Sequence, residues 1–306
     1  MKCACGKEAV YERKYEGTSL CRQCFLKSIE KKVKRTIRKD KLISPGDKIA
    51  VALSGGKDSF LALHIMNEIT KNRKDIELIA MTVDPGMKEF KEALKRTKEA
   101  CKELGIRHYV FTYKSALGRE LVEQISVLRK RLPNVRKKDI CSCCSVARRW
   151  VLNKEARGLS VTKLCTGHNL DDEIQSIMMN YVRGDLMRAV RMSPEPIPYH
   201  KLFIPRIKPL REVPENEIAL YTRLRGFRVH RARCPYRSGI RFEIGDFLDS
   251  LEKRHPGMKF SILETFDKFL PHMADAMRGS PKVMKCRNCG EPSSRELCNT
   301  CELWGD

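Results

Sequence analysis

The sequence predicts an α/β fold: a doubly wound parallel sheet flanked by N- and C-terminal zinc knuckles. Three observations lead to this prediction. Apolar stretches of strand length alternate with amphipathic helical stretches over residues 47–182, the pattern of successive βαβ units. A glycine-rich turn separates the first strand from its helix. Cysteines spaced for a metal ion lie near both ends of the chain.

Each predicted element follows from its hydrophobic periodicity. A polar, basic helix at 27–41 leads into the sheet. The predicted strands are residues 47–54, 76–84, 107–113 and 161–168. The predicted helices between and after them are residues 58–71, 87–104, 118–131 and 171–182. Periodicity does not give the order of the strands, so the sheet topology is left open.

The chain changes character after Gly184. Residues 192–217 contain six prolines, which exclude a regular helix and predict an extended excursion over the surface. Further helices are predicted at 214–226, 242–254 and 258–275. The predicted domains are an N-terminal zinc finger, a catalytic domain with a basic helical region, and a C-terminal zinc finger, at residues 1–26, 27–275 and 276–306.

The charge balance favours a polyanionic partner. The 306 residues include 61 Lys and Arg against 38 Asp and Glu, a net charge of +23. Basic residues concentrate at 27–41, 128–138 and 223–241, which favours nucleic acid over the alternative of a generally basic, thermophile-like surface. No apolar run is long enough to span a membrane, and the N-terminus lacks the apolar core of a secretory signal. We therefore expect a cytoplasmic protein.

A phosphate-binding loop is predicted at Ser54-Gly55-Gly56-Lys57-Asp58-Ser59, between a buried strand and a helix. In this geometry, main-chain N–H groups and the helix N-terminus can bind a phosphate, and the lysine adds a cation. The loop is not a Walker A motif, because Val51 stands where that motif has its first glycine and Asp58 follows the lysine. Asp58 suits Mg²⁺ coordination or helix capping.

A second polar patch follows the strand at 161–168. It reads Gly167-His168-Asn169-Leu170-Asp171-Asp172 and opens the next predicted helix. Parallel sheets bind ligands beyond the carboxyl ends of their strands, so this patch should share a crevice with the phosphate-binding loop. The alternative is a plain helix cap. The turn at 83–86, with Val83 and Asp84, is the expected adenine and ribose side.

The fourteen cysteines form separate groups, and disulfides are not expected in a reducing compartment. The terminal sets have the pairing of structural zinc sites: Cys3, Cys5, Cys21 and Cys24, and Cys286, Cys289, Cys298 and Cys301. Cys101 and Cys165 lie in apolar patterns and are expected in the core.

The central cysteines differ from the terminal sets. Cys141 and Cys144 have CxxC spacing, and Cys234 lies far along the chain. Three thiolates leave one open position on a metal or cluster, which favours an iron–sulfur site. A third zinc site completed by a histidine and a metal-free persulfide pair are the alternatives. Cys143 could substitute for a neighbour, although the spacing selects Cys141 and Cys144.

The hexapeptide at 54–59 resembles the PP-loop of N-type ATP pyrophosphatases, which have an adenine nucleotide α-hydrolase-like fold. The patch at 167–172 resembles the second motif of tRNA-modifying PP-loop enzymes. With the central cysteines and both knuckles, nearly the whole chain resembles the TtuA/Ncs-type tRNA 2-thiouridine synthetases. The extra cysteine, Cys143, is a departure from their pattern.

This resemblance implies a tRNA uridine 2-sulfurtransferase that adenylates the uracil C2 oxygen with ATP and then transfers sulfur. It implies that Cys141, Cys144 and Cys234 hold a 4Fe–4S cluster whose open iron carries the sulfur. The implied catalytic residues are these three cysteines with Asp58 and Asp171. The implied ATP-binding residues are Ser54, Gly55, Gly56, Lys57, Asp58, Ser59, Val83, Asp84, Gly167, His168 and Asp171.

The resemblance also implies partners. These are tRNA, Mg²⁺, a ubiquitin-like thiocarboxylate sulfur carrier or free sulfide, and a second copy of the chain as a homodimer. Two other functions are open on sequence alone: a PP-loop amidotransferase or ligase acting on a small molecule, and a non-enzymatic zinc-finger RNA-binding protein. The sequence does not select between a T-loop and a wobble uridine, nor does it fix the cluster nuclearity.

Overall fold

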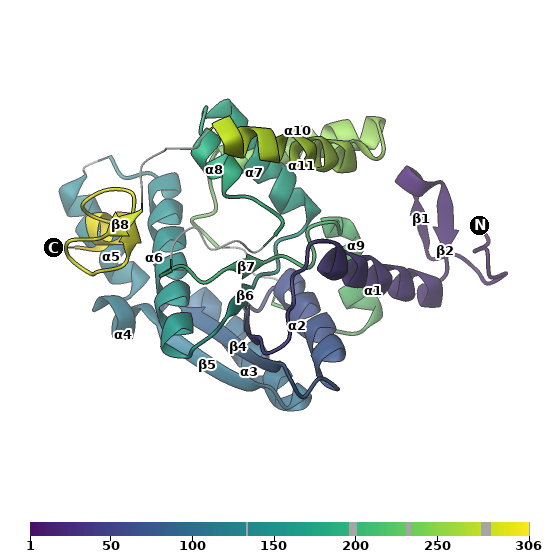
Figure 1. Ribbon diagram of the computed structural model, residues 1–306, viewed down its shortest axis with the longest axis horizontal. Helices are drawn as coiled ribbons and strands as arrows, with labels where there is room; N and C mark the ends of the chain where they lie inside the picture. The colour runs from purple at the N-terminus through teal and green to yellow at the C-terminus, as the bar shows by residue number, and fades with distance from the viewer. Residues whose placement is uncertain (133, 196–200, 231–233, 277–282, 306) are drawn as a thin grey trace.

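The computed structural model describes residues 1–132, 134–195, 201–230, 234–276 and 283–305. The predicted surface excursion, two of the basic stretches and the start of the predicted C-terminal domain therefore lie partly outside the described residues. At the centre is a five-stranded parallel sheet of order β5–β4–β3–β6–β7 (Figure 1). Its strands are β3 Lys48–Ala52, β4 Glu77–Asp84, β5 Arg107–Thr112, β6 Lys163–Cys165 and β7 Arg206–Ile207.

The strand order reverses direction between β3 and β6. Strands β3, β4 and β5 step one way across the sheet, whereas β6 and β7 are added on the other side of β3. Such a switch point opens a crevice at the carboxyl ends of the two strands. The phosphate-binding loop follows β3 and the second polar patch follows β6, so both predicted motifs lie at this crevice.

Helices cover both faces of the sheet, which confirms the doubly wound prediction. Ile49 and Val51 belong to the apolar cluster on one face, whereas Ala50, between them, belongs to the cluster on the other. The first face packs against α1 Arg22–Lys39, α2 Lys57–Thr70, α3 Lys91–Leu104 and α9 Glu215–Leu224. The second packs against α4 Tyr113–Leu117, α5 Leu121–Arg131 and α6 Lys137–Gly158. Cys101 and Cys165 are buried, as predicted.

Helix α6 is the longest helix, among the residues that the structure describes, and the sequence patterns above did not predict it. Its buried positions Ile140, Cys143, Ala147 and Val151 recur every three or four residues, which is a helical signal that the cysteine spacing obscured. The helix ends just before β6 begins, so it runs antiparallel to the strands. Its N-terminal half, with Cys141, Cys143 and Cys144, therefore lies toward the carboxyl ends of the strands.

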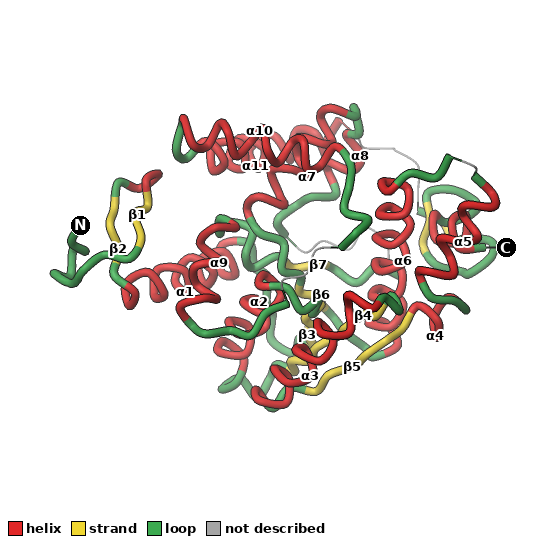
Figure 2. Tube along the Cα trace, turned by 180° about the vertical axis from the view of Figure 1, so that it is seen from behind, coloured by secondary structure: helices red, strands yellow, loops and turns green. Residues whose placement is uncertain are grey.

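A third group of helices has its own apolar cluster, with Leu170, Ile174 and Phe266 among its buried members. The group consists of α7 Leu170–Val182, α8 Leu186–Val190, α10 Ile240–Arg254 and α11 Met258–Ala276. These four helices lie together on one side of the sheet (Figure 1 and Figure 2). The prediction of an extended surface excursion at 192–217 is wrong for most of the described part, which consists mainly of turns and buries Leu210 and Val213 completely. Only the short edge strand β7 is extended, and α9 begins at Glu215.

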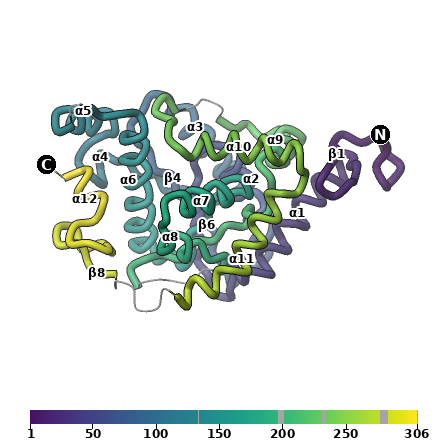
Figure 3. Tube along the Cα trace, turned by 90° about the horizontal axis from the view of Figure 1, so that it is seen from above, coloured from purple at the N-terminus to yellow at the C-terminus, as the bar shows by residue number. Residues whose placement is uncertain are grey.

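The two cysteine-rich ends lie at opposite ends of the molecule (Figure 1). The N-terminal end contains β1 Tyr11–Arg13, the 3₁₀ turn η1 Lys14–Glu16 and β2 Thr18–Leu20, and the C-terminal end contains β8 Met284–Lys285, β9 Pro292–Ser293 and α12 Asn299–Trp304. Arg13 anchors the first by a buried ion pair with Glu217 of α9, Nε to Oε1 2.8 Å. Helix α12 packs beside α6 (Figure 3).

Smaller differences from the sequence prediction occur at element ends. The predicted strand at 161–168 shortens to β6. The predicted helix at 118–131 begins at Leu121, and the separate helix α4 precedes it. Another 3₁₀ turn, η2 Lys88–Phe90, begins the helix predicted at 87–104. Within the described residues, no helix is long and apolar enough to cross a membrane.

Candidate functional site

The loop between β3 and α2 is held in one tight conformation. The Ser59 hydroxyl accepts from the Ser54 main-chain N–H at 3.2 Å and donates to the Gly56 carbonyl at 3.0 Å. Gly55 has φ +85°, and a Cβ there would lie 2.7 Å from the Ala93 Cβ, so the turn and its packing both require glycine. No side chain caps α2, and the N–H groups of its first turn are free to bind an anion.

Lys57 lies at the mouth of this turn between two carboxylates. Its Nζ is 2.6 Å from Glu215 Oε1 and 3.0 Å from Asp58 Oδ2. Burial alone would lower the pKa of Lys57, but the two carboxylates outweigh burial and raise it. Burial raises the pKa of Asp58, with Lys57 and Asn169 opposing the change. The Lys57 ammonium is therefore a positioned cation. Its partners in this structure are carboxylates, and a phosphate group can take their place.

The second polar patch touches the first loop directly. A Cβ on Gly167 would lie 2.8 Å from both the Asp58 carbonyl carbon and the Ser59 nitrogen, so the close approach itself requires glycine. Asn169 caps α7 by accepting from the Asp172 N–H at 3.0 Å, and its side-chain amide donates to Asp58 Oδ1 at 3.0 Å. The two motifs therefore form one crevice. Of these two helices α7 has a side-chain cap and α2 has none, which leaves α2 as the better anion site of the two.

His168 and Asp171 have partners within the protein. His168 Nδ1 is 2.8 Å from Thr166 Oγ1, and burial lowers the pKa of His168 to about 4, so the imidazole is neutral at pH 7. Asp171 Oδ2 accepts from the Glu215 N–H at 2.7 Å, and Oδ1 accepts from Lys259. In this structure the Asp171 carboxylate therefore ties α7 to the start of α9 and to α11.

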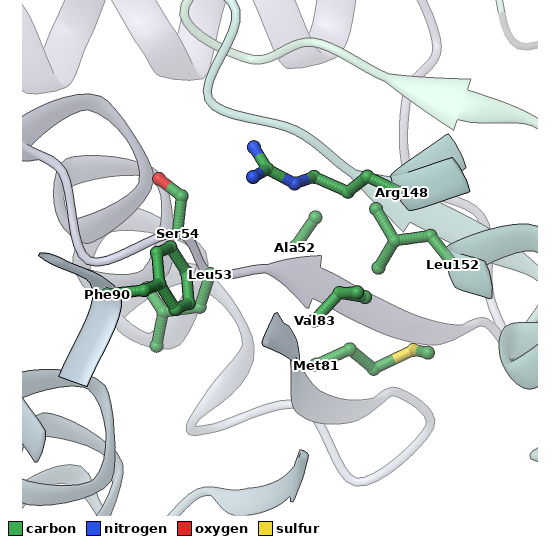
Figure 4. A pocket seen from close by; sticks show the side chains of 8 residues that line it. All are labelled: Ala52, Leu53, Ser54, Met81, Val83, Phe90, Arg148 and Leu152. Carbon is green, nitrogen blue, oxygen red and sulfur yellow. The ribbon is translucent and has the colours of Figure 1, made fainter. Parts of the chain in front are cut away.

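A pocket opens beside the loop at the ends of β3 and β4. It encloses about 270 Å³, part of it open to solvent, and is mainly apolar. Its lining residues are Ala52, Leu53, Ser54, Met81, Val83, Phe90, Arg148 and Leu152 (Figure 4). Val83 thus lies where the sequence placed the adenine side. Asp84 is not in the lining, and its carboxylate accepts from the Gly86 N–H at 2.9 Å.

The central cysteines differ in burial, and three of them, Cys141, Cys143 and Cys144, lie on α6. Cys143 is fully buried, and its main-chain carbonyl accepts from the Trp304 indole N–H at 3.4 Å. Cys141 and Cys144 are half-buried, and Cys234 is exposed. Burial, and then the thiols of Cys144 and Cys234, raise the pKa of Cys141, so both thiols lie near enough to Cys141 to act on its charge. The fold therefore separates Cys143 from the other three.

The terminal cysteine sets are packed more tightly. In each set the four Sγ atoms lie within 4.8 Å of one another, a spacing that one tetrahedral ion can bridge, whereas within the described residues the central three thiols do not form such a group. Cys5 Sγ is 3.6 Å from Cys21 Sγ, and Cys289 Sγ is 3.7 Å from Cys298 Sγ. An all-thiolate set with wider spacing fits a polynuclear iron–sulfur group better than a single ion.

Arg148 connects the pocket with the central thiols, and sequence reasoning missed it. It lies one turn after Cys144 on α6, with Nη2 3.8 Å from Cys144 Sγ and its guanidinium 6.0 Å from the centre of the Phe90 ring. Its Nε is buried with no acceptor among the described residues. Figure 4 shows the side chain crossing the pocket toward Ser54. The i, i+4 spacing from Cys144 is a signal, but only once α6 is known to be helical.

A parallel sheet with this loop and this second patch defines a PP-loop ATP-binding domain. Residues 25–231 match the model of the PP-loop domain family, and residues 2–26 match that of the N-terminal LIM domain of the 2-thiouridine synthetase TtuA.

Relatives give a narrower assignment. The chain is 36% identical to the tRNA 2-thiolation protein NcsA of Haloferax volcanii, over 99% of this chain and 98% of that protein. It is 30% identical to the tRNA-5-methyluridine(54) 2-sulfurtransferase of Pyrococcus horikoshii, over 100% of this chain and 94% of that protein. The chain belongs to the tRNA 2-thiolation family of PP-loop proteins.

One solved structure covers almost the whole chain. The U34-tRNA thiolase NcsA from Methanococcus maripaludis, determined with its [4Fe-4S] cluster, superposes with a TM-score of 0.83 at 33% identity. The match covers 99% of this chain and 95% of that one. The fold and the family predicted from the sequence are therefore confirmed.

Proposed function

We propose that this protein is a tRNA uridine 2-sulfurtransferase that activates the uracil C2 oxygen with ATP and replaces it with sulfur. One observation carries the proposal. The pocket beside the phosphate-binding loop is lined by both Ser54 and Arg148, and Arg148 Nη2 lies 3.8 Å from Cys144 Sγ. A nucleotide in the pocket and a sulfur-handling centre on α6 would therefore be neighbours.

The chain's own groups suit the first half-reaction. The uracil C2 oxygen attacks the α-phosphorus of ATP, an O–P bond forms, and pyrophosphate leaves with the electron pair of the broken bond. The free N–H groups at the start of α2 and the Lys57 ammonium would stabilise the phosphate charge. Mg²⁺ would bind the phosphates and the Asp58 carboxylate. Val83 would contact the adenine.

The second half-reaction replaces oxygen by sulfur without net oxidation or reduction. A sulfide-level sulfur attacks C2, and AMP leaves with the original oxygen. Arg148 is placed to stabilise the leaving phosphate, because its buried Nε has no acceptor in the described part of the chain and its side chain crosses the pocket toward Ser54. The tRNA must present the uracil out of its stack to reach this position.

The donor sets fit two kinds of metal group. Cys141, Cys144 and Cys234 would hold a 4Fe–4S cluster, which when bound supplies one iron without a protein ligand, able to carry sulfide. The terminal sets would each hold one zinc ion, which folds a segment too short to have a core of its own. The proposed domains are residues 1–26, 27–275 and 276–306. We further propose a cytoplasmic homodimer that takes sulfur from a thiocarboxylated carrier or from free sulfide.

The test is anaerobic reaction of the protein with tRNA, ATP, Mg²⁺ and sulfide, followed by nucleoside mass spectrometry. We expect 2-thiouridine, with one AMP and one pyrophosphate for each sulfur inserted. Nuclease mapping of the thiolated product then identifies position 34 or 54, the two positions named for the relatives above.

The rival functions predict different results. A ligase acting on a small molecule forms AMP without thiolating tRNA. A zinc-finger RNA-binding protein binds tRNA but forms no AMP. Either result, obtained with protein that retains its iron, would contradict the proposed function.

A further inference from the structure

A group of arginines lies on the opposite side of the crevice from the nucleotide pocket. The arginine cluster consists of Arg149, Arg188, Arg206 and Arg241. They come from four elements that are far apart in the sequence, α6, α8, β7 and α10. None of them belongs to the phosphate-binding loop, the second polar patch or the cysteine sets.

The fold brings Arg149 and Arg206 to the same level. Asn153 of α6 ties down the segment before β7: it donates to the Leu202 carbonyl at 2.8 Å and accepts from the Ile204 N–H at 2.9 Å. Arg149 lies one turn back from Asn153, about 6 Å along the helix axis. Arg206 lies two residues beyond Ile204, about 7 Å along the strand. Because α6 and β7 run in opposite directions, both steps lead toward the carboxyl edge of the sheet.

The side chain of Arg206 lies on the α6 face of the sheet. Arg206 pairs with Leu164 of β6, which belongs to the apolar cluster that α6 covers. The next pair, Ile207 with Cys165, belongs to the cluster on the other face. Strand alternation therefore directs Arg206 toward α6, where Arg149 is its neighbour.

The charges of the arginine cluster are only partly neutralised. Arg241 Nη2 is 2.5 Å from Asp172 Oδ1, and Arg188 Nε is 3.1 Å from Asp185 Oδ2. Arg149 and Arg206 have no carboxylate partner among the described residues.

Burial, and then repulsion from Arg149, lowers the pKa of Arg206 to about 10. Burial, and then Arg188 and Arg241, lowers the pKa of Arg149. Arg206 is half-buried without a carboxylate partner, and the exposed Arg149 beside it adds repulsion, so an anion bound between the two guanidinium groups would be stabilising.

We propose that the arginine cluster binds a backbone phosphate of the tRNA strand next to the target uridine and so guides that nucleotide into the crevice. This inference rests on the proposed function. Arginine suits the role, because its planar donors match phosphate oxygens. A flipped nucleotide is held mainly through its flanking phosphates, which position a strand without reading its sequence.

The position of the cluster favours RNA over the phosphates of ATP. The nucleotide pocket lies over β3 and β4, whereas Arg206 lies on the edge strand β7, with β6 between them. Arg148 and Arg149 are adjacent on α6, so a rotation of about 100° directs them to different sides. Arg149 and Arg188 are also exposed, as contacts with a macromolecule require.

The experiment measures tRNA affinity by fluorescence anisotropy as a function of salt. The variant is the double substitution Arg149→Gln, Arg206→Gln. The matched control is Lys95→Gln, Lys102→Gln, which removes the same charge from exposed positions of α3. We expect the double variant to bind tRNA several-fold more weakly and its log–log salt slope to fall by about 1, because one phosphate contact is lost. The control should match the wild type, and ATP affinity should be unchanged in both.

The fold of the variant is checked by its melting temperature, which should stay equal or rise, because the substitutions relieve repulsion. Arg149→Gln alone, at an exposed position, provides a second variant, whose slope should fall in the same direction but by less than that of the double variant. An unchanged salt slope in both variants overturns the inference. If the wild-type protein still thiolates tRNA, the proposed function is unaffected by that result. Weaker ATP binding with normal tRNA binding assigns the cluster to the nucleotide and also overturns it. Wild-type protein that neither binds nor thiolates tRNA removes both proposals.

Discussion

The central and the terminal cysteines use the same chemical group in two different settings. Each terminal set closes four sulfurs to within 4.8 Å, on a short segment at one end of the molecule. The central three are spread over α6 and a distant loop, and one of them, Cys234, is exposed. Under the proposed function, a zinc ion on a terminal set would have no room for a further ligand, whereas a cluster on the central three thiolates would keep one position open. Thiolate number and spacing are therefore the features that we propose distinguish a structural site from a reactive one.

The neighbours of the two kinds of site differ as well. The C-terminal set packs its α12 against α6, and Trp304 of α12 meets Tyr113 of α4 edge to face at 5.1 Å. Tyr113 in turn donates to the Cys144 carbonyl at 2.7 Å. The central thiols instead adjoin Arg148 and the pocket. The C-terminal set therefore supports α6, the helix that carries Cys141 and Cys144.

The largest effect expected is from the central thiols. Changing Cys141, Cys144 or Cys234 to Ala should abolish 2-thiouridine formation and lower the iron content, because each removes one ligand. Nucleoside mass spectrometry and iron analysis measure the two results. Cys143→Ala is the matched control from the same turn of α6. Its thiol is buried among apolar side chains, so iron content and product should be retained. Full thiolation by any of the three variants would contradict the proposal that these thiolates hold a cluster needed for sulfur transfer.

The next effect concerns the phosphate-binding loop. Lys57→Ala and Asp58→Asn should each slow AMP formation by about a hundredfold or more, because they remove charge that acts on the phosphates. Iron content should stay at the wild-type level, which separates this half of the site from the thiols. Lys71→Ala, at the exposed end of the same helix, is the control. Normal pyrophosphate release by both loop variants would overturn the loop assignment.

A smaller effect is expected in the support of α6. Trp304→Ala should lower the free energy of unfolding by about 3 kcal/mol, since it removes a large side chain that is only 4% exposed. Denaturant unfolding monitored by the far-ultraviolet signal measures it. Val10→Ala, an exposed apolar residue of the N-terminal end, should change stability little. Equal stability of Trp304→Ala and wild type would show that the C-terminal end does not brace α6.

The smallest expected effect is on the pH dependence of the free energy of unfolding, and it comes from a histidine of the sheet. Burial, then Lys98, lowers the pKa of His108 from 6.5 to about 4. Between these two pKa values His108 takes up a proton in the unfolded chain but not in the folded chain. The contribution of His108 to the free energy of unfolding is therefore fully present above pH 6.5 and declines as the pH falls toward 4. His108→Asn should flatten part of this decline in urea unfolding. An unchanged pH profile would contradict the assignment.

Much of the fold could be predicted because it depends on local patterns. The strands read as apolar runs and the phosphate-binding loop as a motif, and both lie where expected. Helix α6 was missed because its cysteines and basic residues drew the interpretation toward metal chemistry, although Ile140, Cys143 and Ala147 keep helical spacing. The edge strand β7 has two residues and no periodicity of its own, so only its pairing with β6 defines it.

The candidate site was predictable in its motifs but not in its partners. The spacing alone could not show that Gly167 presses on the first turn of α2, or that Asp171 is held by Lys259 from α11. Arg148 and the arginine cluster depend on how helices pack across the sheet. Contacts between distant segments are set by tertiary packing, which a single sequence does not display.

The most direct test of the account is a crystal structure of the anaerobically purified protein with a non-hydrolysable ATP analogue, using anomalous scattering to identify the metals. We expect the triphosphate on the main-chain amides between Ser54 and Ser59, and iron at Cys141, Cys144 and Cys234 facing the same pocket. A nucleotide bound elsewhere, or zinc on the central thiolates, would contradict the proposal that activation and sulfur transfer share one site.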